Sequence, residues 1–170
     1  YDKSEFLHEY LPVANFTEKY WEFANKDGQE FGVKLFGAKT GLRGTKIFGK
    51  RPKLAVLDDL MSDDDARSPT AIQSINDTIY KGVDYALDPN KRKVIFNGTP
   101  FAKNDPIITA VESGVWDAAV YPVCEQWPCT KEEFKGAWPD RFGWDAINAL
   151  YEKAIGTGHG AAFHQELMLR

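Results

Sequence analysis

The sequence predicts an α/β fold in which a parallel sheet is flanked by helices in three layers, with a β-hairpin near the N-terminus. Residues 54–58 and 93–97 are short apolar runs rich in strand-forming residues. Between them, apolar residues recur at helical spacing over residues 69–86. A strand, a helix and a second strand in this order are typical of parallel strands joined by a right-handed crossover.

The N-terminal part is expected to form a helix, a hairpin and a loop. Residues 4–11 can form a short amphipathic helix. Residues 19–24 and 31–36 alternate like two strands, and residues 25–28 have the composition of a hairpin turn. Residues 37–52 are rich in glycine and are predicted to be a loop.

The helix over residues 69–86 is expected to begin after Ser68, an N-cap, with Pro69 in the first helical position. Residues 54–58, 93–97 and a third predicted strand would form the parallel sheet. The elements predicted beyond residue 97 are a helix from Asp105 to Gly114, a strand over 118–123, an irregular segment over 127–140 and helices over 143–155 and 161–169.

The composition fits a single folded domain. The 170 residues are 43% hydrophobic and 14% aromatic, which supports a core and argues against disorder. No apolar stretch approaches the roughly 20 residues that cross a bilayer, so no membrane partner is expected. Two cysteines fit a reducing cytosol at least as well as they fit a disulfide. The chain starts at Tyr1 without an initiator Met or a signal-peptide pattern, which suggests a piece of a longer chain.

Polar side chains end both central strands. Asp58 and Asp59 close the first strand, and Asn97, Gly98 and Thr99 close the second. The carboxyl ends of parallel strands meet at one edge of a sheet, where α/β proteins build their sites. A carboxylate there can hold Mg²⁺, and its neighbour can orient a water against a phosphate. The sequence therefore predicts a nucleotide-hydrolysing site, although acids also end strands that merely reach the surface, and Thr99 also fits an ordinary turn.

Charge is distributed unevenly along the chain. The net charge of −4 argues against a protein that coats nucleic acid non-specifically. From Phe31 to Lys53, however, all seven charged residues are basic, and the acids Asp58, Asp59 and 63–65 follow. This switch suits a site that faces a polyanion through a metal, and a solvated loop explains it equally well.

A phosphate-binding loop is not predicted. Residues 32–40 approach the required pattern, but an extra Ala38 moves Lys39 out of register. Gly41 and the glycines after it disfavour the helix whose N-terminus should receive the phosphates. The phosphate loop is therefore judged absent.

Two metal-site patterns are also rejected. Cys124 and Cys129, with His159 and His164, have the number but not the spacing of zinc ligands, so core thiols and surface histidines are expected. The acidic run 63–65 lacks the alternation and the central glycine of a calcium loop. That run is expected to cap the helix that follows or to lie in solvent.

Four segments resemble the ATPase domain of the large terminase subunit, the DNA-packaging motor of tailed phages. They are Gly41–Gly44, Gly49–Asp59, Phe96–Pro100 and Phe163–Leu167, within a likeness that covers about residues 33–170. The resemblance implies a P-loop NTPase-like three-layer fold. It also implies that residues 1–170 are a partial ATPase domain, with the Walker A loop upstream and the nuclease domain downstream.

The resemblance implies roles for the residues at the strand ends. Asp58 would hold Mg²⁺ in the Walker B element, and Asp59 would polarise the attacking water. Gly98, Thr99 and Pro100 would match the motif that couples hydrolysis to DNA movement, and Arg43 would contact a phosphate or DNA. The residues expected to bind the ATP cofactor are Thr99, Asn97, Gly98 and Arg43.

The function implied is that of a motor segment which hydrolyses ATP to move double-stranded DNA into a prohead, in the cytoplasm of an infected bacterium. The portal protein and the small terminase subunit would be its partners, in a homo-oligomeric ring. This chain alone is expected to be inactive, because Walker A is missing. Two alternatives are a non-catalytic module that binds DNA or partner proteins, and a Mg²⁺-dependent nuclease using Asp58 and Asp59. The nuclease is disfavoured because adjacent side chains of a strand point to opposite faces.

Overall fold

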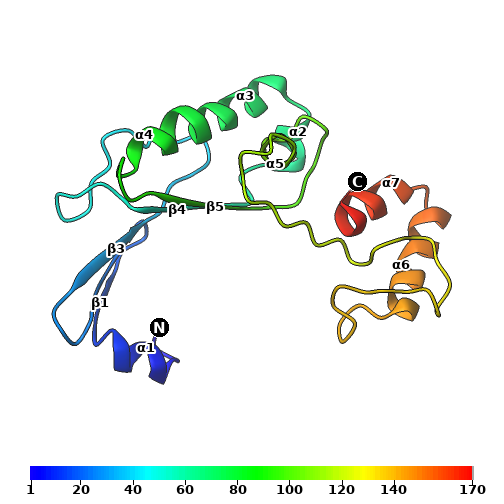
Figure 1. Cartoon of the computed structure of the whole chain (residues 1–170), viewed down its shortest axis with the longest axis horizontal. Coiled ribbons are helices and arrows are strands. Elements are labelled where there is room, and N and C mark those ends of the chain that lie inside the picture. Colours follow the sequence, from blue (N-terminus) through cyan, green and yellow to red (C-terminus); the bar gives the residue numbers. More distant parts are fainter. Residues whose placement is uncertain (170) are drawn as a thin grey trace. The chain divides into compact units, whose positions relative to one another are not determined.

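The computed structural model describes residues 1–169 (Figure 1). The chain divides into two compact units, the first made of residues 1–57 and 73–95 and the second of residues 58–72 and Phe96 onwards. The divisions fall within β4 (Leu54–Asp58) and β5 (Lys93–Asn97), so each unit holds one end of both strands.

The first unit begins with a helix and an antiparallel sheet in the order β1-β2-β3. The Ser4 hydroxyl accepts a hydrogen bond from the Leu7 N–H and caps the short helix that the sequence predicts within residues 4–11. The predicted hairpin is confirmed, whereas the first strand was not predicted, because four residues carry too little alternation. The elements are α1 (Glu5–Tyr10), β1 (Val13–Phe16), β2 (Tyr20–Ala24) and β3 (Glu30–Lys34).

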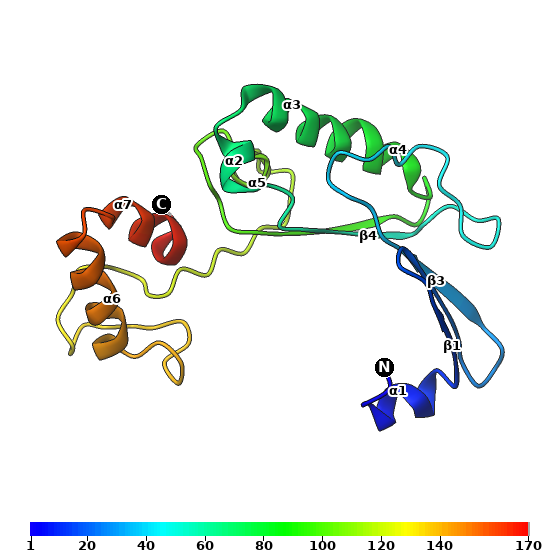
Figure 2. The ribbon, with the colours of Figure 1, turned by 180° about the vertical axis from the view of Figure 1, so that it is seen from behind.

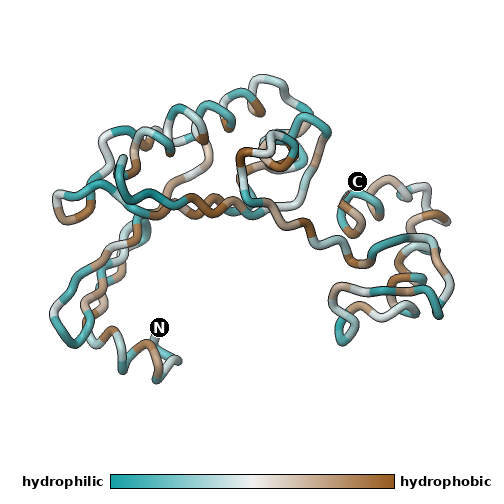
Figure 3. Tube along the Cα trace, viewed as in Figure 1, coloured by the Kyte–Doolittle hydropathy of each residue, from teal (hydrophilic) through white to brown (hydrophobic). Residues whose placement is uncertain are grey.

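The central strands β4 and β5 lie side by side and run parallel. At their amino ends the Lys93 N–H donates to the Lys53 carbonyl (2.8 Å), and at their carboxyl ends the Asp59 N–H donates to the Asn97 carbonyl (3.2 Å). Both strands have the predicted bounds. Figure 3 shows the middle of this pair of strands as hydrophobic and its amino ends as hydrophilic.

The apolar run of residues 54–58 would fit a strand buried on both faces, but β4 is buried on one face only. Leu57 is 6% exposed, but Leu54 and Val56 are 53% and 57% exposed, and Ile95 of β5 is 47% exposed. Successive side chains alternate between faces, so the pair of strands buries one face only. The structure thus shows a mixed α/β arrangement with a two-stranded parallel and a three-stranded antiparallel sheet, which is less than the predicted three-layer sheet.

The predicted central helix is confirmed, with a π-helical stretch in its middle. Ile75, Ile79 and Val83 recur every four residues and are buried, and from Gln73 onwards the helix runs along β4 and β5 (Figures 1 and 2). No helix among residues 1–169 is long and apolar enough to cross a membrane. The helical segments, in order, are α3 (Pro69–Asp77), η1 (Thr78–Val83) and α4 (Asp84–Ala86).

Apart from the ends of β4 and β5, the regular elements of the second unit are helices. Its first element is formed by the acidic run, which makes a helical turn of its own instead of capping the next helix, while Asp63 and Asp64 are exposed, as the alternative expectation of a run in solvent has it. Ser62 and Asp65 cap that turn reciprocally through side-chain and backbone hydrogen bonds. The helices are α2 (Asp63–Ala66), α5 (Pro106–Glu112), α6 (Trp144–Gly156), α7 (Gly160–Phe163) and the π-helical η2 (His164–Met168).

The core of the C-terminal part gathers the irregular segment and the last helices. Trp127 is at its centre, with ring contacts to Phe134, Trp144, Tyr151 and Phe163 at centroid distances of 5.8–6.2 Å. The buried members of this core are Val123, Cys124, Trp127, Ile147, Phe163 and Met168.

The predicted strand over residues 118–123 is wrong. This segment is irregular, and Tyr121 within it is 78% exposed. Val123 donates its N–H to the Leu167 carbonyl (2.7 Å), and its own carbonyl accepts from the Ala137 N–H (2.9 Å). The backbone there is satisfied by the end of a helix and by a loop, so the apolar run does not need a neighbouring strand.

Candidate functional site

The carboxyl ends of β4 and β5 bring most of the predicted site residues together, all within the second unit. The hydrogen bond from the Asp59 N–H to the Asn97 carbonyl joins the two ends. A Cβ atom added to Gly98 would lie 3.5 Å from the Asp59 Oδ1 atom. The paired acids and the turn that carries Thr99 therefore form one edge, as the pairing of parallel strands predicts.

Asp59 departs from strand geometry. Its φ of 42° lies in the left-handed region, which is uncommon for residues other than glycine but tolerated by aspartate. In a regular strand, Asp58 and Asp59 would point to opposite faces. The turn at Asp59 breaks this alternation. The opposite orientation of successive strand residues is therefore no obstacle to the two neighbouring acids acting on one cation.

Both carboxylates are available to a ligand. Asp58 and Asp59 are exposed, and neither side chain forms a hydrogen bond or ion pair with another part of residues 1–169. Within that range no three His, Cys, Asp or Glu side chains gather as a metal-binding group. Mg²⁺, however, is commonly held by one or two carboxylates and completes its shell with water and phosphate oxygens. The exposed Asp58 carboxylate therefore fits Mg²⁺ as a protein ligand, with the Asp59 carboxylate on the neighbouring residue.

Asp105 holds the turn that follows β5. This carboxylate is 3% exposed, the one buried charged side chain in the described part of the chain. Its Oδ1 accepts the Ile107 N–H (2.9 Å) and caps α5, while its Oδ2 accepts the Phe101 N–H (3.0 Å). The same side chain thus starts a helix and closes the loop beyond Thr99.

The sequence predicts only half of this role. The Asp105–Pro106 pair signals the start of a helix, and that prediction is confirmed. The bond to Phe101 depends on the path of the loop, for which the sequence carries no local pattern. An acid that both precedes a proline and follows a strand-end turn by a few residues is the signal that could have suggested it.

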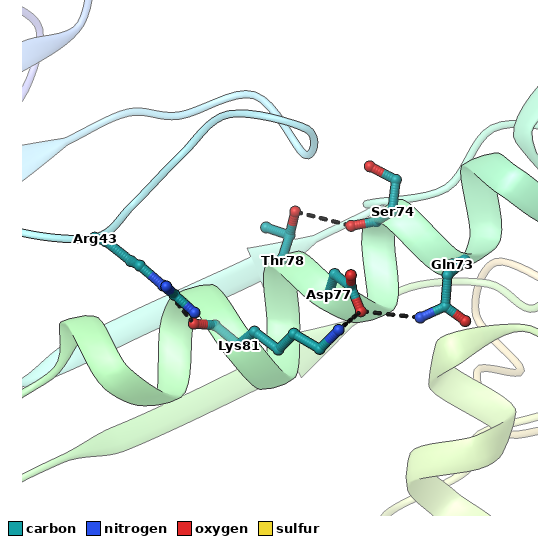
Figure 4. Close-up of polar contacts among 6 residues, drawn as sticks. All are labelled: Arg43, Gln73, Ser74, Asp77, Thr78 and Lys81. Carbon is teal, nitrogen blue, oxygen red and sulfur yellow. Dashed lines mark hydrogen bonds and ion pairs between the residues drawn. The ribbon is translucent and has the colours of Figure 1, made fainter.

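Arg43 belongs to the first unit, and no contact supports the predicted phosphate role. Its Nε donates to the Lys81 carbonyl (3.3 Å), and the Lys81 ammonium pairs with Asp77 at 2.8 Å (Figure 4). Asp77 also accepts a hydrogen bond from Gln73 (2.9 Å). These two bonds, first that of Lys81 and then that of Gln73, lower the pKa of the Asp77 carboxyl. Arg43 therefore anchors the glycine-rich loop to the central helix.

The rejected phosphate-loop pattern has no helix after it. Residues 32–34 lie in β3, and between residue 35 and β4 the described chain contains only loops and an isolated bridge between Ile47 and Lys50. A helix N-terminus that could receive phosphates is therefore missing from this segment.

The cysteines and histidines occupy separate kinds of environment. Cys124 is buried, with its Sγ 3.3 Å from the Gln126 carbonyl oxygen and 3.7 Å from the Met168 sulfur, which confirms it as a core thiol. His159 is exposed, and the ring of His164 packs edge-on against Phe163.

Comparison of the chain with known protein families, with curated proteins and with solved structures found no match in any of the three.

Proposed function

We propose that this chain carries the Walker B and coupling strands of a large terminase subunit, whose ATPase uses Mg²⁺ and ATP to drive double-stranded DNA into a phage prohead. The observation that supports this most is the convergence of Asp58 and Asp59 with the Asn97–Thr99 turn at one sheet edge. Paired acids beside a small, polar turn are suited to a metal-bound triphosphate and its attacking water.

Each residue has a distinct task in this proposal. Asp58 holds the cation, which when bound neutralises charge on the phosphate oxygens. The Asp59 carboxylate, on a residue with a left-handed backbone, lies beside Gly98 and orients the attacking water. Asn97 and Thr99 offer an amide and a hydroxyl to the phosphate side of the same edge. Asp105 fixes the turn that presents them.

The exposed apolar face of β4 and β5 supports a place in a larger domain. Parallel sheets are normally covered on both faces, but Leu54, Val56 and Ile95 are about half exposed here. We propose that further strands and helices of the full motor complete a P-loop NTPase-like three-layer sheet. The proposed assembly is a homo-oligomeric ring with the portal protein and the small subunit, in the cytoplasm of the infected host.

Mg²⁺ titration of this chain, followed by nuclear magnetic resonance, tests the cation site directly. Mg²⁺ is expected to shift the backbone signals of Asp58, Asp59 and Gly98, and Asp58→Asn is expected to abolish the shifts. Asp140→Asn removes one exposed acid from elsewhere in the second unit and should leave the shifts unchanged. Shifts that survive Asp58→Asn would contradict the site.

The catalytic role requires the complete motor protein. There, Asp59→Asn is expected to abolish ATP turnover while nucleotide binding stays close to that of the wild type. Turnover that persists in this variant would exclude Asp59 as the residue that activates water.

A second candidate is a non-catalytic module that binds DNA or partner proteins. The lack of a helix after residues 32–40 favours it, because most backbone donors for a triphosphate are then missing. Both proposals predict weak ATP binding by this chain alone. They separate when the chain is joined to a Walker A segment, because only the motor segment should then support hydrolysis.

A further inference from the structure

We propose that the first unit binds the phosphate backbone of double-stranded DNA through a basic ridge at the amino ends of β4 and β5. This inference gives the DNA partner of the proposed function a binding surface, and its biological meaning rests on that function. The binding itself needs neither Asp58 nor Asp59. The ridge consists of five exposed side chains, Arg51, Lys53, Lys91, Arg92 and Lys93.

Backbone pairing brings the two halves of the ridge together. The Asp88 N–H donates to the Pro52 carbonyl (2.8 Å), and the Lys93 N–H donates to the Lys53 carbonyl (2.8 Å). Neighbouring strands lie about 4.8 Å apart, so Lys53 and Lys93 start from adjacent points of the backbone. Residues separated by some forty positions in the sequence therefore form one basic surface.

The two arginines are held in place by the end of the central helix. The Arg51 Nη1 donates to the Tyr85 carbonyl (2.7 Å), and the Arg92 Nη1 donates to the Asp84 carbonyl (3.1 Å). The last carbonyls of a helix lack partners within the helix, so these bonds satisfy them. A guanidinium group has five N–H donors, and each arginine therefore keeps further donors for a phosphate.

The three lysines have no comparable structural task. Lys53, Lys91 and Lys93 form no ion pair with a carboxylate in the described chain. The neighbouring Asp88 uses its Oδ1 to accept the backbone N–H groups of Asn90 (2.8 Å) and Lys91 (3.1 Å). Like charges on adjacent strands repel, and a bound polyanion would relieve this repulsion.

Duplex DNA fits this surface better than a membrane or an acidic protein does. It carries one negative charge per roughly 1.7 Å of helix axis, so several phosphates can meet a compact group of cations. Guanidinium forks held at fixed positions match phosphate oxygens well. Membrane surfaces instead attract amphipathic helices or flexible basic segments, whereas these cations stand on paired strand ends and a helix cap. The net charge of −4 for the whole chain makes weak, salt-sensitive binding the expectation.

Fluorescence anisotropy of a labelled duplex of about 25 base pairs, titrated with this chain at about 25–200 mM NaCl, tests the proposal. Neutralisation of three or four phosphates predicts a slope of about −3 for log affinity against log salt. Lys53→Gln with Lys93→Gln should reduce that slope by about 2 and weaken binding about tenfold at the lowest salt. Lys3→Gln with Lys19→Gln removes the same charge from exposed lysines outside the ridge, and should change affinity less than about twofold.

Three kinds of result would decide against the DNA-binding ridge or distinguish it from the catalytic proposal. No binding at the lowest salt, or equal weakening by both lysine pairs, would overturn the proposal. Tighter binding to phosphatidylglycerol vesicles or to polyglutamate than to the duplex would overturn it as well. Circular dichroism establishes that the variants fold, and Lys91→Gln, outside the strands, replaces the double variant if that one unfolds. Asp59→Asn should bind the duplex like the wild type, so failure of the ridge and failure of the catalytic proposal can be distinguished.

Discussion

Replacing Asp105 with alanine is expected to lower the free energy of unfolding by about 2–4 kcal/mol. Loss of an N-cap contributes about 1 kcal/mol of this, because the Ile107 N–H loses its acceptor. The Phe101 N–H also loses its partner, and an unsatisfied, partly buried donor adds about 1–3 kcal/mol. Urea denaturation measures the sum.

Asp105→Ser separates the two contributions. Serine caps helices about as well as aspartate, but its side chain is too short to reach the Phe101 N–H. The serine variant should therefore be about 1 kcal/mol more stable than the alanine variant. Hydrogen exchange at the Phe101 amide should accelerate in both variants, and exchange at Ile107 only in the alanine variant. Unchanged exchange at Phe101 in the serine variant would refute the reasoning that Asp105 holds the turn after β5.

Two further perturbations probe the candidate site and the central helix. Gly98→Ala should have a folding stability within about 1 kcal/mol of the wild type, since the added methyl group meets the Asp59 Oδ1 at an ordinary 3.5 Å. The methyl group should nevertheless weaken the Mg²⁺-induced signal shifts, because it crowds the space beside that carboxylate. Lys81, and then Gln73, lower the pKa of Asp77 in the folded state. Its carboxylate therefore stabilises the fold above its ordinary pKa of 3.8, and this stability is lost as the pH falls through the lower folded-state pKa. Thermal melting of the wild type and Asp77→Asn should accordingly converge at the acidic end of a pH series.

Matched variants show what would contradict these two predictions. Gly156→Ala changes a helical glycine with no atom near the added methyl group, and it should leave the Mg²⁺ shifts as they are. Equal effects of both glycine substitutions would exclude crowding of Asp59. Asp63→Asn removes an exposed acid that forms no side-chain hydrogen bond or ion pair in the described chain, and a convergence as large as that of Asp77→Asn would refute the assignment to Asp77.

Local patterns predicted most of the elements, because periodicity and caps act within a few residues. The bounds of β4 and β5 and the start of the central helix at Pro69 follow from such patterns. Features that depend on partners distant in sequence were missed. β1 exists because β2 pairs with it, and Val123 bonds to Leu167 and Ala137 instead of to a strand.

The candidate site divides in the same way. Parallel pairing alone predicted that Asp58 and Asp59 would meet the turn carrying Thr99, because strand ends share an edge. The left-handed backbone of Asp59 and the second bond of Asp105 follow from the paths of connecting loops, which no periodicity encodes. Arg43 was assigned by resemblance to a phosphate contact, and its observed partner is the Lys81 carbonyl.

The backbone conformation of Asp59 lowers the folding stability at the residue that supplies a carboxylate to the candidate site. An L-residue in this conformation is held at a penalty of about 1 kcal/mol, which glycine at the same position would avoid. Glycine would therefore yield a sturdier protein without the carboxylate. An aspartate is expected in this conformation where the function of its carboxylate outweighs its cost in stability. The strain therefore marks this edge as a place where the protein has a lower folding stability than it could have.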